Sequence, residues 1–331
     1  MKTLKQALAF SLLLIAGSVA GASDIDPGAE ALDSELAPRL DALLSETVGA
    51  GRLPGVVAGI ATANEVRYLA GAGMRDLEAR SRMTEDTIIA IASMTKPVTT
   101  VAVLQLMERG LVDLDAPVSR YLPELGELQL LQGFDAQTGA ILRDAPSAPT
   151  VRQLLTHTSG FVYEIWNPAV FRAVQSGALP SLFVGKAGLS KLLAFMAGER
   201  WEYGIGIDWA GLLVEQLSGQ TLDTYFKEHI FTPLKMVDTS YFAAETQAER
   251  TATIYARTPK GLVPTPDPAP VVLGGGGLYS TVSDYLRFLR TLLAGGSLDG
   301  QRILQSTTVD VMFRNQIGEA EVRAAKRKKI V

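Results

Sequence analysis

The chain has 331 residues, of which 47% are hydrophobic and 20% charged, so it is too apolar for a disordered protein and long enough for one large or two modest domains. Its 31 Lys and Arg residues against 35 Asp and Glu give a net charge of −4, so the composition offers no basic field for nucleic acid. With no cysteine and only two histidines, it also excludes disulfides, a thiol nucleophile, iron–sulfur clusters and a Cys- or His-rich metal site.

The first 22 residues are typical of a secretory signal peptide. Lys2 and Lys5 precede an apolar stretch over residues 7–20, and cleavage fits after the small residues Ala20 or Ala22. The apolar stretch is shorter than the ~20 residues that a membrane span needs. The sequence therefore predicts export to the periplasm or the exterior, with no stable membrane span once the signal is removed.

Hydrophobic spacing after the signal peptide predicts a mixed α/β chain. Apolar residues between positions 36 and 48 recur at helical spacing and predict an amphipathic helix. Two β-type segments, 55–62 and 66–72, are joined through Ala63-Asn64 and predict a hairpin. Residues 87–92 predict a short buried strand, and the proline-rich residues 110–150 predict irregular structure. Further helices are predicted at 94–109, 151–155, 189–196, 209–217 and 284–293.

The order of these elements predicts how the chain divides into domains. Strands lie near both ends and helices lie between them, which favours a discontinuous α/β domain with a helical insertion. The predicted division is a signal peptide over 1–22, an α/β domain over 23–92 and 266–318, a mostly helical part over 93–265, and an unstructured basic tail over 319–331.

Ser93-Met94-Thr95-Lys96 is the segment to which the chemistry points. A serine at the start of a helix lies beside unpaired backbone N–H groups, and the helix dipole favours negative charge there. A lysine three residues later lies on the same helix face, and a partly desolvated lysine amine can take the proton of a serine hydroxyl. The pattern also fits a serine N-cap beside an exposed lysine. The apolar approach over 87–92 and the apolar helix that follows favour a catalytic pair.

A longer pattern runs through five segments: residues 93–125, LLTHTSG at 154–160, ERWEYGIGIDWAG at 199–211, FTPLKMVDTSY at 231–241, and residues 274–293. Together they resemble the serine β-lactamase and penicillin-binding-protein superfamily, closest to its class C-like branch, which includes carboxylesterases with a β-lactamase fold. The resemblance implies an α/β, β-lactamase/DD-peptidase-like fold in which helices flank an antiparallel sheet beside a mostly helical insertion. It implies Ser93 as the acylated nucleophile and Lys96 as the proton acceptor.

Tyr203 matches the tyrosine of the family's second motif, where a phenol beside Lys96 would relay a proton. The alternative is an ordinary buried tyrosine with a hydrogen-bonded hydroxyl. Ile205 stands where class C β-lactamases carry the asparagine of Tyr-x-Asn, so the amide that would bind a β-lactam's acylamino group is missing. This difference favours an esterase, and Ile205 is a candidate substrate-binding residue.

Several residues near these motifs are open to two interpretations. Tyr163 and Trp166 follow the LLTHTSG segment and either line an acyl or alcohol pocket or pack the helical part. The resemblance gives His157 a structural role rather than that of a base. The four glycines at 274–277 are expected to let a strand pass close to the active-site helix.

The family's third motif, Lys-Thr-Gly, His-Thr-Gly or Trp-Gly-Gly on a strand near the C-terminus, has no counterpart after Gly296. In the family that strand supplies the second oxyanion-hole N–H. Because the pattern also stops after Gly318, the sequence predicts a chain that ends several strands and a helix short. Uncovered apolar surface would then make it poorly soluble and weakly active.

The sequence thus predicts an exported serine hydrolase that acts through an acyl-enzyme on small carboxylic esters, with a small-molecule ester or amide as its substrate. A D,D-peptidase or β-lactamase is the alternative, and a truncated, inactive family member is the second. No metal or organic cofactor and no nucleic-acid partner is implied. The candidate residues are Ser93, Lys96 and Tyr203 for catalysis and Tyr163, Trp166 and Ile205 for substrate binding.

Overall fold

The computed structural model describes residues 29–135, 139–242, 245–266 and 271–322. The predicted signal peptide and residues 323–331 of the predicted tail lie outside these ranges. Contacts divide the chain into two compact units. Unit 1 is formed from Met1–Ala90, Ala243–Ala269 and Ser280–Arg290, and unit 2 from Ile91–Phe242, Pro270–Tyr279 and Thr291–Val331.

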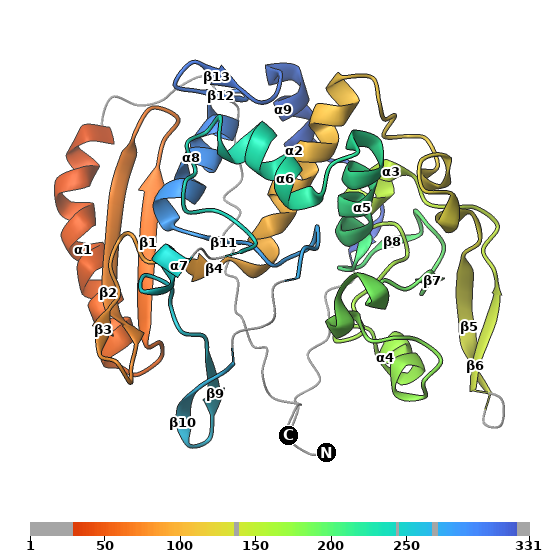
Figure 1. Cartoon of the computed structure of the whole chain (residues 1–331), viewed down its shortest axis with the longest axis horizontal. Helices are drawn as coiled ribbons and strands as arrows, with labels where there is room; N and C mark the ends of the chain where they lie inside the picture. Colours follow the sequence, from red (N-terminus) through yellow and green to blue (C-terminus); the bar gives the residue numbers. More distant parts are fainter. Residues whose placement is uncertain (1–28, 136–138, 243–244, 267–270, 323–331) are drawn as a thin grey trace. The chain divides into compact units, whose positions relative to one another are not determined.

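Unit 1 is built on a small antiparallel sheet. Strand β1 (Gly55–Ala61) pairs with β2 (Val66–Asp76), which pairs in turn with β3 (Ser81–Arg82). The predicted hairpin over residues 55–72 is therefore confirmed. The predicted first helix is confirmed as α1 (Ala29–Gly49), which lies along the sheet in Figure 1.

Helices pack on both faces of this sheet. On one face the Tyr68 hydroxyl donates to Asp41 of α1 at 2.8 Å. Gly59 pairs with Leu69, the neighbour of Tyr68, so it faces the other way. A Cβ atom on Gly59 would come within 2.7–2.8 Å of side chains of α8 (Val282–Leu293), so α8 packs directly on the strand backbone there. The predicted helix at 284–293 is confirmed.

The other elements of unit 1 are short. Strand β4 (Ile89–Ala90) follows the sheet along the chain, at the position predicted for a short strand. Helix α7 (Glu245–Ala248) is followed by an antiparallel hairpin of β9 (Tyr255–Thr258) and β10 (Gly261–Pro264). This hairpin lies in a stretch that the sequence assigned to the helical part, and in the structure it belongs to unit 1.

Unit 2 is centred on two buried helices that contact each other, α2 (Thr95–Glu108) and α5 (Gly206–Ser218). Both carry apolar residues around much of their circumference, which is typical of a helix buried in a core. With α3 (Val151–Leu155) they confirm three of the predicted helices. Gly110 and Gly219 end α2 and α5 in left-handed conformations with φ near +71°.

The stretch over residues 110–150 is more regular than predicted. It contains an antiparallel hairpin of β5 (Gln129–Asp135) and β6 (Gly139–Asp144). The helix predicted at 189–196 is wrong, because Leu192–Leu193 form strand β7 in parallel with β5. The Ser190 hydroxyl accepts the N–H of Leu192 at 2.9 Å, a local bond that competes with helical hydrogen bonding.

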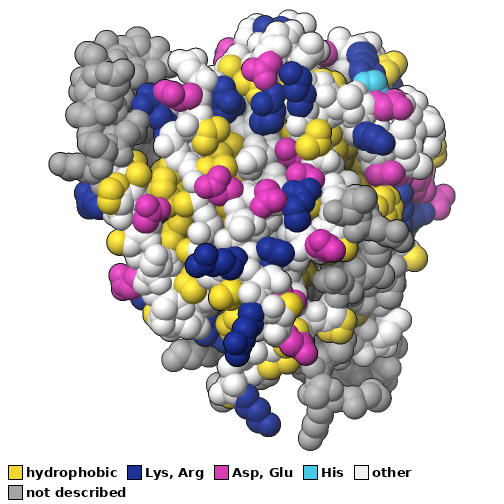
Figure 2. Space-filling model, turned by 60° about the vertical axis from the view of Figure 1, so that its left-hand side comes forward, with side chains coloured by type: hydrophobic (Ala, Val, Ile, Leu, Met, Phe, Trp, Pro, Cys, Tyr) yellow, Lys and Arg dark blue, Asp and Glu magenta, His cyan; other side chains and the backbone are white. Residues whose placement is uncertain are grey.

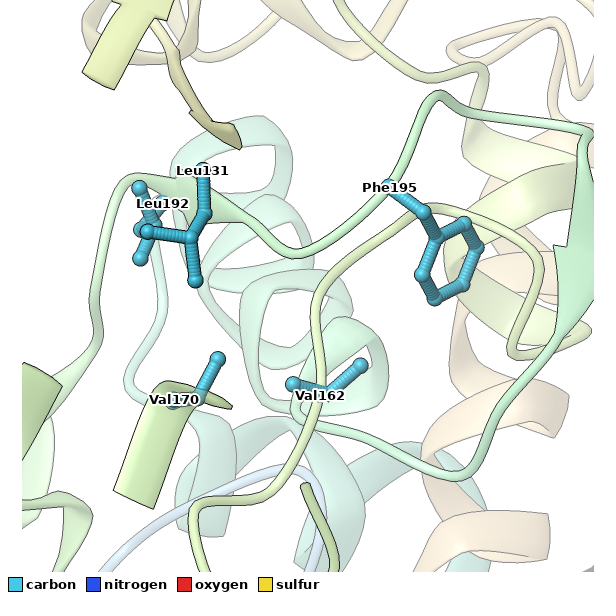
Figure 3. Close-up of a cluster of buried hydrophobic side chains, with 5 residues drawn as sticks. All are labelled: Leu131, Val162, Val170, Leu192 and Phe195. Atoms are coloured by element: carbon cyan, nitrogen blue, oxygen red, sulfur yellow. The ribbon is translucent and has the colours of Figure 1, made fainter. Parts of the chain in front are cut away.

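A cluster of buried side chains joins this sheet to the segment that follows α3. In Figure 3, Leu131 of β5 and Leu192 of β7 lie beside Val170 of α4 (Pro168–Gln175), with Val162 and Phe195 beside them. Burial of these side chains stabilises the segment around residue 162, which also carries Tyr163.

The remaining elements of unit 2 are helical segments of three to seven residues and two-residue strands. They are η1 (Ala92–Met94), η2 (Val118–Arg120), η3 (Pro123–Gly126), η4 (Leu182–Gly188), β8 (Arg200–Trp201), α6 (Leu222–Phe226), η5 (Lys227–Phe231), β12 (Ser297–Leu298), β13 (Gln301–Arg302), α9 (Ser306–Met312) and β14 (Glu321–Val322). Strand β11 (Tyr279–Ser280) stands where one unit gives way to the other along the chain.

The helices and the surface bear on the sequence predictions about membrane spanning and charge. Within the ranges that the structure describes, no helix is both long and apolar enough to cross a bilayer. On the face shown in Figure 2, basic and acidic side chains are interspersed rather than gathered by sign.

Candidate active site

Ser93 lies in the turn η1, directly before α2, and Lys96 lies in the first turn of α2. The preceding residue, Ala92, has φ +45°, an uncommon value for a residue other than glycine. The Lys96 Nζ donates to the Ser93 Oγ at 3.1 Å. Ser93 is half-buried, whereas Lys96 is only 6% exposed. The alternative of an exposed lysine beside a capping serine is therefore wrong.

The glycine run at 274–277 holds α2 through its carbonyl groups. The Gly275 carbonyl accepts from Lys96 Nζ, and the Gly274 carbonyl accepts from the Thr99 hydroxyl, each at 2.6 Å. A Cβ atom on Gly274 would collide with the carbonyl of Ile207 in α5. The predicted strand is wrong, because Gly274 and Gly275 lie in a turn. The close approach that the absent side chain of Gly274 permits is to α5, and the run reaches α2 through its carbonyl groups.

Asp208, in the first turn of α5, is an acidic residue of the site that sequence reasoning missed. It is 2% exposed, its Oδ1 accepts the Gly275 N–H at 2.8 Å, and its Oδ2 accepts the Tyr163 hydroxyl at 3.3 Å. Burial raises the pKa of Asp208, and the nearby charge of Lys96 opposes this rise. Burial also raises the pKa of Tyr163 well above its usual range, and the charge of Asp208 adds to it. The only signal in the sequence was one carboxylate in the apolar start of a helix.

Tyr203 presents its ring face to the Lys96 amine. The Lys96 Nζ lies 4.8 Å from the centre of the Tyr203 ring, a cation–π distance. The rings of Tyr163 and His157 lie 5.2 and 4.7 Å from that of Tyr203. The structure therefore places all three predicted catalytic residues together.

His157 is held as part of the backbone support of Tyr203. Its φ is +58°, its carbonyl accepts the Glu202 N–H at 2.9 Å, and its Nδ1 accepts the Gly204 N–H at 3.3 Å. Burial, followed by the positive charge of Lys96, lowers the pKa of His157 to about 3. The imidazole is neutral at pH 7, and its position fits the structural role that the resemblance implied.

The three predicted substrate-binding residues lie in different surroundings. Tyr163 lies in the site, with the Lys96 Nζ 5.3 Å from its ring centre. Ile205 precedes α5 and is buried, and its carbonyl accepts the Asp208 N–H at 3.0 Å. Trp166 is 40% exposed. Their binding roles stay predictions.

A cavity of about 280 Å³ lies beside Lys96, and it was not predicted from the sequence. It follows one face of α2, where Lys96, Thr100 and Leu104 recur at the spacing of helical turns. That periodicity is the signal by which it could have been found. The other lining residues come from α2 and the segment after it, from α3 and the residues after it, from α5, and from α9 and its continuation: Pro97, Leu114, Arg152, Leu155, Thr156, His157, Ile207, Val311, Met312 and Gln316.

Metal ligands are not grouped in this site. In the part of the chain that the structure describes, no cluster of three or more His, Asp or Glu side chains is placed to hold a metal ion.

Comparison with known proteins decides the family. The sequence profile of the family described as Beta-lactamase matches residues 40–325. The chain belongs to this family. The monacolin J acid methylbutanoyltransferase of Aspergillus terreus is 37% identical over 242 residues, which are 69% of this chain and 57% of that protein. Esterase EstB of Burkholderia gladioli is 32% identical over 329 residues, covering 90% of this chain and 79% of the esterase.

The fold is likewise that of the β-lactamase family. The solved structure of simvastatin synthase (LovD) from Aspergillus terreus, in its LovD6 mutant form, is similar with a TM-score of 0.75 and 31% identity. The match covers 89% of this chain and 73% of that chain. The predicted β-lactamase-like α/β fold is confirmed. The chain described here spans little more than half the length of the methylbutanoyltransferase that it matches.

Proposed function

We propose that the chain is a serine hydrolase that acts through an acyl-enzyme on small carboxylic esters. The observation that carries this proposal is the buried Lys96 amine, whose Nζ lies 3.1 Å from the Ser93 Oγ at the start of a helix. This geometry suits transfer of the serine proton to the lysine, which activates the oxygen as a nucleophile. The similarity to an esterase supports the ester as substrate class.

The first half of the reaction forms the acyl-enzyme. The Ser93 Oγ attacks the ester carbonyl carbon while its proton passes to the unprotonated Lys96 amine. The Ser93 N–H serves as one donor to the oxyanion, beside the positive end of the helix. Tyr203, whose ring is next to Lys96, relays the proton to the alcohol oxygen as the ester bond breaks. The alcohol leaves, and the acyl group stays on Ser93.

The second half releases the acid. Water gives its proton to the Tyr203–Lys96 pair and its oxygen attacks the acyl carbon. The carboxylic acid departs, and Ser93 recovers its proton. The two halves use the same residues with the direction of proton transfer reversed, as is usual in general acid–base catalysis.

Acyl transfer is a second candidate, favoured by a specific observation. Two of the similar proteins are named as a methylbutanoyltransferase and a synthase. In such a reaction an alcohol takes the place of water in the second half, and the product is a new ester. The acyl-enzyme on Ser93 is common to both reactions.

The sequence also raised the questions of an alternative activity and of export. A β-lactamase or D,D-peptidase activity is disfavoured because the buried Ile205 offers no side-chain amide. Export through the N-terminal signal stays a prediction. Residues 1–22 lie outside the described ranges, and residues 319–322 of the predicted tail include strand β14, which pairs in parallel with β8.

The test uses the purified chain with p-nitrophenyl butyrate, nitrocefin and a fluorophosphonate probe. We expect ester cleavage and labelling at Ser93, with Ser93→Ala losing at least about 10³-fold in rate. Ser159→Ala is the matched control, because Ser159 is a buried serine of the same unit. Labelling that persists in Ser93→Ala, or that requires Ser159, contradicts the proposal. A folded wild-type chain that neither labels nor cleaves supports the inactive alternative.

The partition between water and an alcohol separates the two candidate functions. Adding a short-chain alcohol to the p-nitrophenyl butyrate reaction gives a new butyrate ester only if the acyl-enzyme accepts alcohols. A hydrolase gives butyrate alone. Mass spectrometry of the products measures the ratio.

A further inference from the structure

Asp208 is a buried acidic residue to which the reaction described above gives no role. Its carboxylate is enclosed between α5, the Gly275 backbone and Tyr163, with a donor on each oxygen. An ionised carboxylate without partners would be costly at such a place. The donors from Gly275 and Tyr163 favour the ionised form and so oppose the effect of burial.

The carboxylate reaches Lys96 through one residue of backbone. Asp208 holds the N–H of Gly275 at 2.8 Å, and the carbonyl of the same glycine accepts from Lys96 Nζ at 2.6 Å. The position of that carbonyl therefore depends on the carboxylate. The Tyr163 hydroxyl donates to the other carboxylate oxygen, so the position of the Tyr163 ring beside Lys96 depends on Asp208 as well.

The fit of Gly275 against Asp208 leaves no room for a side chain. A Cβ atom on Gly275 would lie 2.6 and 2.7 Å from the two carboxylate oxygens, closer than any real contact. At the next residue, Gly276, a Cβ atom would meet only the Ala92 backbone, at 3.8 Å or more. Two adjacent glycines thus differ sharply in what they tolerate.

We propose that Asp208 is a positioning residue, whose carboxylate fixes Gly275 and, through its carbonyl, aims the Lys96 amine at Ser93. A neutral amine has two N–H groups and one lone pair, so an N–H held by the Gly275 carbonyl restricts the direction of the lone pair. Proton transfer from Ser93 needs that direction to be constant. The proposal rests on the proposed function of Ser93 and Lys96.

The charge of Asp208 adds an effect that a purely structural residue would lack. The titratable groups that face Lys96 and Asp208 come from several segments of unit 2: His157, Tyr163, Tyr203 and Tyr241. His157 is neutral at pH 7, and burial raises the pKa of Tyr163 and Tyr241. Removing the carboxylate would therefore take a negative charge out of the site, which should alter the pH dependence of the reaction at Ser93.

The experiment measures the rate of fluorophosphonate labelling at Ser93 between pH 5 and 9 in the full chain. In Asp208→Asn we expect the maximal rate to fall by about 10–100-fold. The acidic limb of the profile should move to lower pH by about one pH unit. Gly275→Ala should lower the maximal rate by a similar factor, because it displaces the carboxylate without removing it. Gly276→Ala is the matched control and should stay within about twofold of wild type, a change worth ~0.4 kcal/mol.

The outcomes are separable. If the wild-type chain is not labelled at Ser93, the proposed function fails and this inference falls with it. If the wild-type chain is labelled and Asp208→Asn has the same maximal rate, or a reduced rate with an unmoved acidic limb, only the positioning role is overturned. If Asp208→Asn does not fold, Gly275→Ala against Gly276→Ala decides, and equal rates in these two overturn the role.

Discussion

Acidification should destabilise the folded chain through His157. Burial, and then the charge of Lys96, hold the pKa of this histidine at about 3 in the folded chain, against an ordinary value of 6.5. Below pH 6.5 the unfolded chain therefore binds a proton at this position that the folded chain does not bind. The stability due to neutral His157 is complete above that pH and is lost as the pH falls toward 3.

The size of this loss follows from the two pKa values. Between pH 7 and pH 5 the linkage relation gives about 2 kcal/mol, and the maximum slope is ~1.4 kcal/mol per pH unit. That is a large part of the ~5–15 kcal/mol by which domains are usually stable. The effect should be visible without complete unfolding.

Urea unfolding at pH 7, 6 and 5 measures it, on the wild-type chain and on His157→Asn. Asparagine accepts the φ of +58° at this position and does not titrate. The variant loses the ring contact with Tyr203 and should be less stable at pH 7. Its further loss between pH 7 and 5 should be smaller than that of wild type by about 2 kcal/mol.

The other histidine provides the control for this comparison. His229 is half-buried, and burial also lowers its pKa, so His229→Gln reports how much of the pH dependence comes from elsewhere. Equal losses of stability in wild type and His157→Asn over this pH range would refute the reasoning. Such a result would mean that His157 takes up its proton in the folded chain.

Two further substitutions test the supports of the site. Gly204→Ala should destabilise the chain by about 1–3 kcal/mol and slow Ser93 labelling, because the added Cβ would collide with the Phe161 carbonyl beside Tyr203. Thermal unfolding measures the loss of stability, and Gly133→Ala, where the space is open, is the control. Thr150→Ala should lower the free energy of unfolding by about 1 kcal/mol, because it removes the reciprocal cap with Gln153 at the start of α3. Urea unfolding measures this, and an unchanged midpoint would contradict it.

Local patterns explain which parts of the fold could be predicted. The spacing of apolar residues located α2, α3 and α5. It failed at residues 189–196, where the Ser190 hydroxyl and the pairing of β7 with β5 outweigh helical periodicity. It also missed the β5–β6 hairpin, which lies among prolines that suggested irregular structure.

The same distinction applies to the site. Ser93 and Lys96 are three residues apart, so the geometry of one helical turn brings them together and the sequence could predict the pair. Asp208 and Gly275 are 67 residues apart, and nothing near either residue indicates the other. The cavity beside Lys96 depends on α9 as well as α2, and no local pattern connects them.

The contact of α5 with the glycine run has a consequence for how this protein can diversify. Gly211 and Gly274 face each other, and a Cβ atom on either would come within 3.1 Å of the Cα of the other. Neither position can compensate for a larger residue at its partner, because both are already reduced to backbone. In a saturation library this wall should tolerate almost no change, whereas the residues of the nearby cavity can vary in size. New substrate preferences should therefore arise by reshaping the cavity and not by shifting α5 against the glycine run.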